Sequence, residues 1–167
     1  APFSFQDIDT MEVLWRELAD IEPYYAIEHQ GWNLLILNSM RGRYLDRFFD
    51  DLQMQWLEKE LQKELPVLFF FHHPVKTDHI KLWCKPKDLV TPETEPQFFS
   101  LVKAHQQQIK GIFVGHGHRW VEDELFETIP IYETDSFADN DKSPYHLVEI
   151  DGKKNSINVT RHEFIEN

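Results

Sequence analysis

The sequence predicts an α/β protein, and three observations support this class. Residues 66–71 and 111–114 are uninterrupted apolar runs of strand length, as expected for strands covered on both faces of a parallel sheet. A helical pattern precedes each run, which gives the strand–helix–strand order of a parallel crossover unit. After residue 119 the pattern changes to short β-like runs separated by turn residues. We therefore expect mixed sheets flanked by helices.

The N-terminal part is predicted to form one helix and a β-hairpin. Asp9 can cap a helix that continues to about Ala19, and the apolar face of this helix is expected to lie in the core. That face consists of Met11, Leu14, Trp15 and Leu18. Two strands are expected at 24–28 and 32–39, joined around Gln30-Gly31.

A polar and aromatic connector, residues 41–49, leads to the next helix, and its arginines are expected to be solvated. Asp50 or Asp51 can cap this helix. Its apolar face contains Met54, Leu57 and Leu61 at helical spacing. The following strand starts at Pro66, and the right-handed form of this crossover is strongly preferred.

The segment 75–96 is the longest irregular stretch, because three prolines within it prevent a continuous helix. It directly follows a candidate ligand, so we expect it to be a substrate lid or a dimer contact. An amphipathic helix at 98–108 and a strand from Ile109 come next. Later β-like runs are expected to form an antiparallel tail in the second sheet of a sandwich. These runs are residues 120–126, 129–134, 145–150 and 157–164.

Histidines follow both apolar runs. His72-His73-Pro74 closes the first, and Gly115-His116-Gly117-His118 closes the second. If the two strands are neighbours in one parallel sheet, His72, His116 and His118 converge at its carboxyl edge, where open α/β sheets place their ligands. Imidazole binds Zn, Mn, Fe and related ions, so the sequence predicts a metal site. Ordinary structural or loop histidines remain the alternative at this point.

Composition restricts the partners of the chain. The formal net charge is −12, with 29 acidic residues against 17 basic ones, which disfavours a nucleic-acid polymer or an anionic membrane surface. Cys84 is the only cysteine, so neither an intrachain disulfide nor a cysteine-based zinc site can form. This cysteine usage fits a reducing compartment, and we expect a cytoplasmic protein. A homodimer is compatible with the sequence.

Taken in order, these residues resemble the C-terminal half of the calcineurin-like metallophosphoesterases, and above all their small cyclic-nucleotide and glycerophosphodiester phosphodiesterases. The resemblance also covers Pro23-Tyr24-Tyr25, the strand 33–39 and the helix containing Gln55-Trp56-Leu57. It implies the C-terminal portion of an αββα sandwich that hydrolyses a small phosphodiester or phosphomonoester at a dinuclear centre of Mn, Fe or Zn. Two histidines, His72 and His116, would bind one metal, and His118 would bind the other.

The motifs of the first half of this family are absent. No Asp has His two residues later, no Gly is followed by Asp, and no Asn is followed by His, so DxH, GDxxD and GNH[DE] are all missing. We therefore expect residues 1–167 to be a single, incomplete domain whose N-terminal half is missing or supplied elsewhere, and we assign no catalytic residue. Two alternatives are a catalytically inactive regulatory or binding domain with the same fold, and an unrelated α/β domain with one structural metal site.

Overall fold

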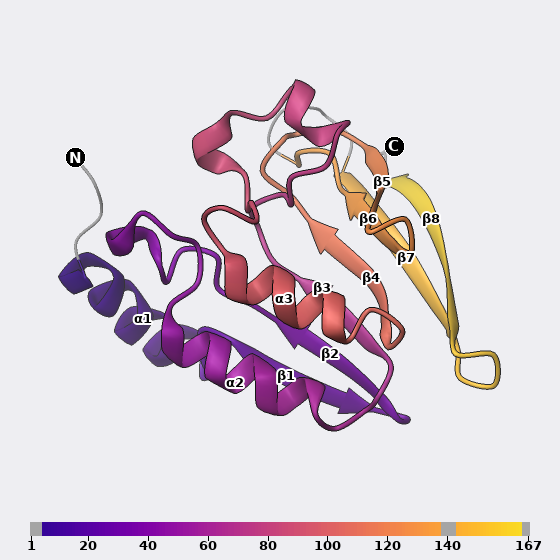
Figure 1. Cartoon of the computed structure of the whole chain (residues 1–167), viewed down its shortest axis with the longest axis horizontal. Coiled ribbons are helices and arrows are strands. Elements are labelled where there is room, and N and C mark those ends of the chain that lie inside the picture. The colour runs from indigo at the N-terminus through magenta and orange to yellow at the C-terminus, as the bar shows by residue number, and fades with distance from the viewer. Residues whose placement is uncertain (1–4, 138–142, 165–167) are drawn as a thin grey trace.

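A six-stranded mixed sheet forms the centre of the computed structural model, which describes residues 5–137 and 143–164 (Figure 1). The strand order is β1-β2-β3-β4-β6-β5. The bounds are β1 Tyr25–His29, β2 Trp32–Ile36, β3 Val67–Phe70, β4 Ile109–Val114, β5 Val121–Leu125 and β6 Ile129–Glu133. The four central strands are parallel, and β1 and β5 pair antiparallel at the two edges. All four central strands therefore end at the same edge of the sheet.

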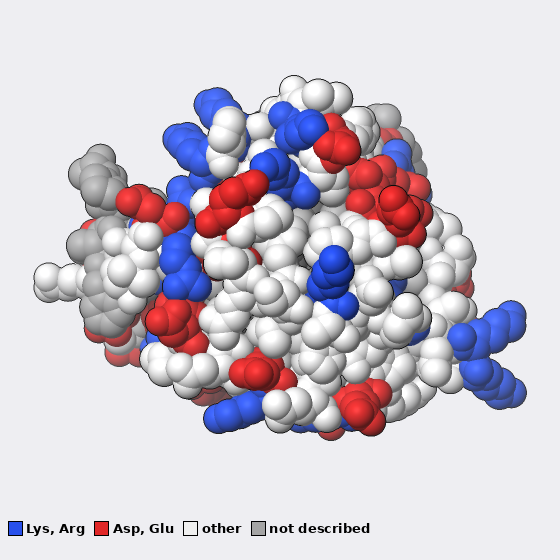
Figure 2. All heavy atoms as spheres, in the orientation of Figure 1, with Lys and Arg blue, Asp and Glu red and all other residues white. Residues whose placement is uncertain are grey.

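Two helices, α2 (Asp51–Leu61) and α3 (Pro96–Ala104), cover one face of this sheet (Figure 1). Asp50 caps α2 as predicted, because its side chain accepts a hydrogen bond from the backbone N–H of Gln53. The helix α3 begins at Pro96, two residues earlier than predicted, because proline is well suited to the first helical turn. It also ends at Ala104, short of the predicted Gln108. Figure 2 shows Lys and Arg interspersed with Asp and Glu on this face.

A hairpin of β7 (Ser143–Asp151) and β8 (Ser156–Phe164) lies against the other face. Apolar side chains of the hairpin, including Val148 and Val159, pack around a small second core that contains Trp32, Leu68 and Phe113. The predicted α/β class, with a mixed sheet flanked by helices, is confirmed.

One part of the predicted tail is wrong. We expected all four late runs to lie in a second sheet, but β5 and β6 extend the central sheet, and β6 pairs parallel with β4. The reason is that Ile129 and Ile131 of β6 are fully buried beneath the helices, which places β6 in the layer that the helices cover.

The prediction for the first helix is also wrong in two respects. Helix α1 runs from Phe5 to Ala19, so Asp9 lies within it and is not its cap. The predicted core face is instead exposed: Met11, Leu14, Trp15 and Leu18 are between 43% and 87% exposed. The residues that α1 buries are Ile8 and Glu12.

Arg41 explains why an acidic residue of α1 is buried. We expected the connector arginines to be solvated, but the Arg41 side chain is only 14% exposed. Its guanidinium pairs with Glu12 of α1 and with Asp50, the cap of α2. Desolvated carboxylates need such a partner, so this ion pair joins the first two helices.

The segment 75–96 is irregular, as predicted, with two short 3₁₀ turns at Ile80–Leu82 and Pro86–Asp88. A third such turn, Arg43–Leu45, lies in the connector before α2. None of the described helices is both long enough and apolar enough to span a bilayer.

Candidate metal-binding site

The two histidine-bearing strands are neighbours in the sheet, which is the condition under which their histidines were expected to converge. Strands β3 and β4 pair in parallel, with Phe70 opposite Phe113. The chain continues side by side beyond the strands, because the backbone N–H of Gly115 donates a hydrogen bond to the carbonyl of His72 at 3.0 Å. The topology thus brings both histidine groups to the carboxyl edge of the sheet.

His72 and His116 form the closest pair in this cluster. Nε2 of His72 lies 3.1 Å from Nδ1 of His116. Two nitrogens bound to one tetrahedral zinc ion, with Zn–N bonds of about 2.0–2.1 Å, are separated by about 3.3 Å. The pair therefore fits two adjacent positions in the coordination sphere of one ion.

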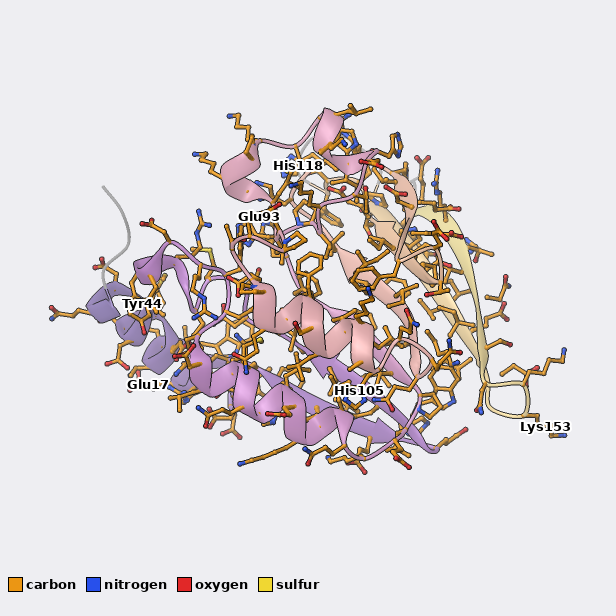
Figure 3. The ribbon with its side chains drawn as sticks, in the orientation of Figure 1. Glu17, Tyr44, Glu93, His105, His118 and Lys153 are labelled. Atoms are coloured by element: carbon orange, nitrogen blue, oxygen red, sulfur yellow. The ribbon has the colours of Figure 1, made fainter. Side chains whose placement is uncertain are left out.

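Fewer side chains lie close enough to occupy the remaining coordination positions of the ion. His118 is exposed in the loop that follows β4 (Figure 3), and it lies near enough to His72 to contribute to the lowering of the pKa of that residue. Within 5–137 and 143–164, no three His, Cys, Asp or Glu side chains are arranged to hold an ion. The described residues thus fit a metal in part, and the assignment of His72, His116 and His118 as ligands stays a prediction.

Burial determines the protonation of the first histidine pair. It lowers the pKa of His72, and the nearby His116 and His118 add to this effect. Burial also lowers the pKa of His73 to about 3, and Nδ1 of His73 lies 2.8 Å from the hydroxyl of Ser39. A metal binds only neutral imidazole, so the lowered pKa keeps His72 in the form that a ligand requires.

The backbone of the second histidine group is strained at the histidines. His116 and His118 have φ of 75° and 51°, in the left-handed region that non-glycine residues rarely adopt. Neither Gly115 nor Gly117 has a positive φ. The role of Gly117 is close packing, because a Cβ there would lie within 3.0 Å of the Trp83 ring and of Glu133 Oε1.

Replacement of Gly117 by Ala is therefore expected to destabilise the protein. Both Trp83 and Glu133 must move to admit the methyl group, which costs about 1–3 kcal/mol and lowers Tm by about 3–10 °C. Thermal unfolding followed by circular dichroism measures the effect. Gly152→Ala is the matched control, since no atom lies within 4 Å of a Cβ at that position. Equal Tm values for the two variants would contradict the packing role.

Sequence reasoning missed two carboxylates at this edge. Glu133, the last residue of β6, is fully buried, and its Oε1 accepts a hydrogen bond from the backbone N–H of Gly117. Asp88 places Oδ2 3.7 Å from Nε2 of His116. For Glu133, a possible signal was an acidic residue directly after the apolar run 129–132, whereas Asp88 lies in an irregular segment without any local signal.

Glu133 is held in an unfavourable environment for a charge. Burial raises its pKa to about 7, although the Gly117 hydrogen bond and Arg119 act in the opposite direction. Its second oxygen, Oε2, is buried and has no hydrogen-bond partner among the described residues. Ionised Glu133 therefore destabilises the folded state.

We expect Glu133→Gln to change how stability depends on pH. An unfolded Glu has a pKa of about 4.3, so between about pH 4.5 and 7 the folded wild type keeps a proton that the unfolded chain has lost. The Glu133 contribution to stability thus falls as pH rises through this window. Glutamine does not ionise, so it is free of this loss. The free energy of unfolding of the variant, relative to that of the wild type, should therefore increase by up to about 3 kcal/mol between pH 5 and pH 8.

Urea unfolding of both proteins at several pH values tests this prediction. Contributions of the histidines are common to both proteins and cancel in the difference. A difference in unfolding free energy that stays constant from pH 5 to pH 8 would contradict it.

Comparison with known proteins supports the resemblance seen in the sequence. No protein-family model matches the chain. The chain is 29% identical over 99 residues to a probable cyclic nucleotide phosphodiesterase of Synechococcus sp., and the match covers 59% of this chain and 36% of that protein. It is structurally similar to a dimetal phosphatase from Danio rerio, with a TM-score of 0.52 and 16% identity, over 80% of this chain and 57% of that one.

The chain therefore spans about a third of the first protein and little more than half of the second. The restriction of the resemblance to a C-terminal half stays a prediction. The fold shared with the dimetal phosphatase, together with the sequence similarity, supports the resemblance of this chain to the calcineurin-like metallophosphoesterase superfamily.

Proposed function

We propose that this chain carries the histidine side of a metal-dependent phosphoesterase site. The observation that carries the proposal is the approach of His72 Nε2 to His116 Nδ1, 3.1 Å apart at the ends of two parallel strands. The similarity to a cyclic nucleotide phosphodiesterase and the fold of a dimetal phosphatase support the same reaction class. The substrate is a small phosphoester, and the cofactors are divalent ions of Mn, Fe or Zn.

The residues of this chain have separate tasks in the proposed site. His72 and His116 hold one ion, and His118 binds a second. Glu133 fixes the backbone of Gly117 and so positions the loop between the two histidines. Asp88 faces the far nitrogen of His116 and orients its ring. When bound, the ions supply Lewis-acid activation of water and of the phosphoryl oxygen.

We further propose that carboxylate or amide ligands from outside these 167 residues complete the site. Three neutral imidazoles leave the charge of two dications uncompensated. The described residues contain no group of three donors arranged for an ion. We therefore expect this chain to bind metal only weakly by itself.

Metal content and hydrolysis measured together test the proposed function. The purified chain is dialysed against Zn²⁺, Mn²⁺ or Fe²⁺, and bound metal and hydrolysis of bis(p-nitrophenyl) phosphate are measured. Metal uptake, with or without slow hydrolysis, supports the proposal. Absence of both supports the inactive regulatory or binding domain. Uptake of one ion whose removal unfolds the chain supports the structural metal site, because a catalytic ion on a preformed scaffold can be removed without unfolding.

A further inference from the structure

An apolar cleft of about 360 Å³ opens beside His72, at the same edge of the sheet as the histidines. Helix α1 forms one wall and the residues at the end of β2 form the other. Its apolar lining includes Ile8, Met11, Trp15, Pro23, Ile36 and Met40. The volume lies within the range of about 300–1,000 Å³ that small-molecule sites occupy.

The polar side chains of the cleft are already engaged by the protein. Asn38 donates from Nδ2 to Glu12 Oε1 at 3.2 Å and accepts at Oδ1 from the backbone N–H of Met40 at 3.0 Å. The other carboxylate oxygen of Glu12 binds Arg41, and the Ser39 hydroxyl pairs with His73. A sugar or glycerol group would therefore bury hydroxyls opposite groups that have partners, which is unfavourable.

The half-exposed side chains of α1 suit an aromatic ligand. Met11 and Trp15 are a thioether and an indole, and both make favourable contacts with aromatic rings. Trp15 is held in place, because its Nε1 donates to the carbonyl of Glu22 at 3.3 Å. Little ordering of this ring is then needed when a ligand binds.

We propose that this cleft binds the aromatic part of the phosphoester whose phosphate group lies at the histidines. The inference rests on the proposed function, since His72 belongs both to the cleft and to the histidine pair. It restricts the substrate class: phosphoesters with an apolar aryl group fit, and glycerophosphodiesters do not. Burial of apolar surface provides most of the binding free energy of the aromatic group, and hydrogen bonds to that group contribute little.

Methionine methyl NMR tests the proposal with an internal comparison, because the chain has three methionines. Met11 and Met40 line the cleft, whereas Met54 is fully buried in the core. In the presence of diamagnetic Zn²⁺, phenyl phosphate is expected to shift the methyl resonances of Met11 and Met40 and to leave that of Met54 unchanged. Glycerol phosphate and inorganic phosphate are expected to leave Met11 unchanged. Equal shifts of Met11 with glycerol phosphate would overturn the proposal.

A pair of variants on α1 gives the matched control. Met11→Gln should weaken phenyl phosphate binding about fivefold, because a polar amide replaces the apolar thioether that lines the cleft. Val13→Gln should leave the affinity unchanged, since Val13 is exposed to the same extent, 44% against 43%, but does not line the cleft. An equal loss in both variants would overturn the assignment.

Phenol, which carries no phosphate, separates failure of the cleft from failure of the metal site. It is expected to shift Met11 and Met40 without any metal. Zn²⁺ uptake without a phenol shift overturns the cleft proposal and leaves the proposed function standing. A phenol shift without Zn²⁺ uptake overturns the proposed function and leaves an aromatic-binding cleft. Shifts of Met11 that arise on concentrating the protein alone would show that a second copy covers the cleft, and would overturn the proposal.

Discussion

Replacement of His116 by Ala is expected to remove metal binding by this chain. His116 Nδ1 lies 3.1 Å from His72 Nε2, so its loss leaves a single imidazole at the centre of the site. Substitution of a residue that merely orients a ligand costs about 10–100-fold in metal affinity, so loss of the ligand itself should cost at least about 100-fold. Competition between the protein and a zinc-sensitive dye measures the affinity directly and does not depend on catalysis.

A matched variant shows whether the effect belongs to the site. His29→Ala removes an imidazole from the exposed end of β1, within the hairpin of β1 and β2. It should leave zinc affinity unchanged, and both variants should unfold at the wild-type temperature in the absence of metal to within a few degrees. Zinc binding by His116→Ala at wild-type affinity would remove His116 from the site.

The parts of the fold that could be predicted are those with a strong local signal. The apolar runs 66–71 and 111–114 have the length of buried strands, and the helical pattern before each one favours parallel pairing. The sheet partner of 129–134 could not be predicted, since pairing is decided by residues distant in sequence. The face of α1 shows a related limit. Periodicity identifies an apolar face, but it does not identify what covers that face.

The candidate site, like the fold, could be predicted only where the sequence carries a local signal. Parallel pairing of two strands is sufficient to bring His72 next to His116, so the prediction of their proximity is confirmed. The carboxylates Glu133 and Asp88 reach the site from a different strand and from an irregular segment. Only the tertiary fold brings these residues to the histidines, and no spacing in the sequence indicates it.

Arg41→Met is expected to produce the largest loss of stability. The guanidinium is paired with Glu12 and with Asp50, whose carboxylate accepts from Nε at 2.6 Å, and each acidic side chain is only 7% exposed. Methionine keeps much of the apolar stem but leaves Asp50 without its cation, and it leaves Glu12 with only Arg16, whose Nη2 lies 3.7 Å away. Breaking a buried ion pair in this way costs about 3–5 kcal/mol. Urea unfolding gives the free energy of unfolding, and amide hydrogen exchange should show the loss of protection first in α1.

Two further variants test whether the lost stability comes from buried carboxylates that no longer have Arg41 as a partner. In Arg41→Met/Glu12→Gln a neutral amide replaces one of the two carboxylates that lose Arg41, so the second substitution should restore part of the lost stability. Arg16→Ala removes an ion pair with Glu22, which is 66% exposed, and a longer contact of 3.7 Å with Glu12, and it should cost much less stability than Arg41→Met because water replaces the exposed guanidinium. If Arg41→Met costs no more than Arg16→Ala, α1 is held by its apolar contacts, and the ion pair contributes no more than an exposed one. If it costs several kcal/mol, Arg41 determines the position of the helix that forms one wall of the cleft beside His72.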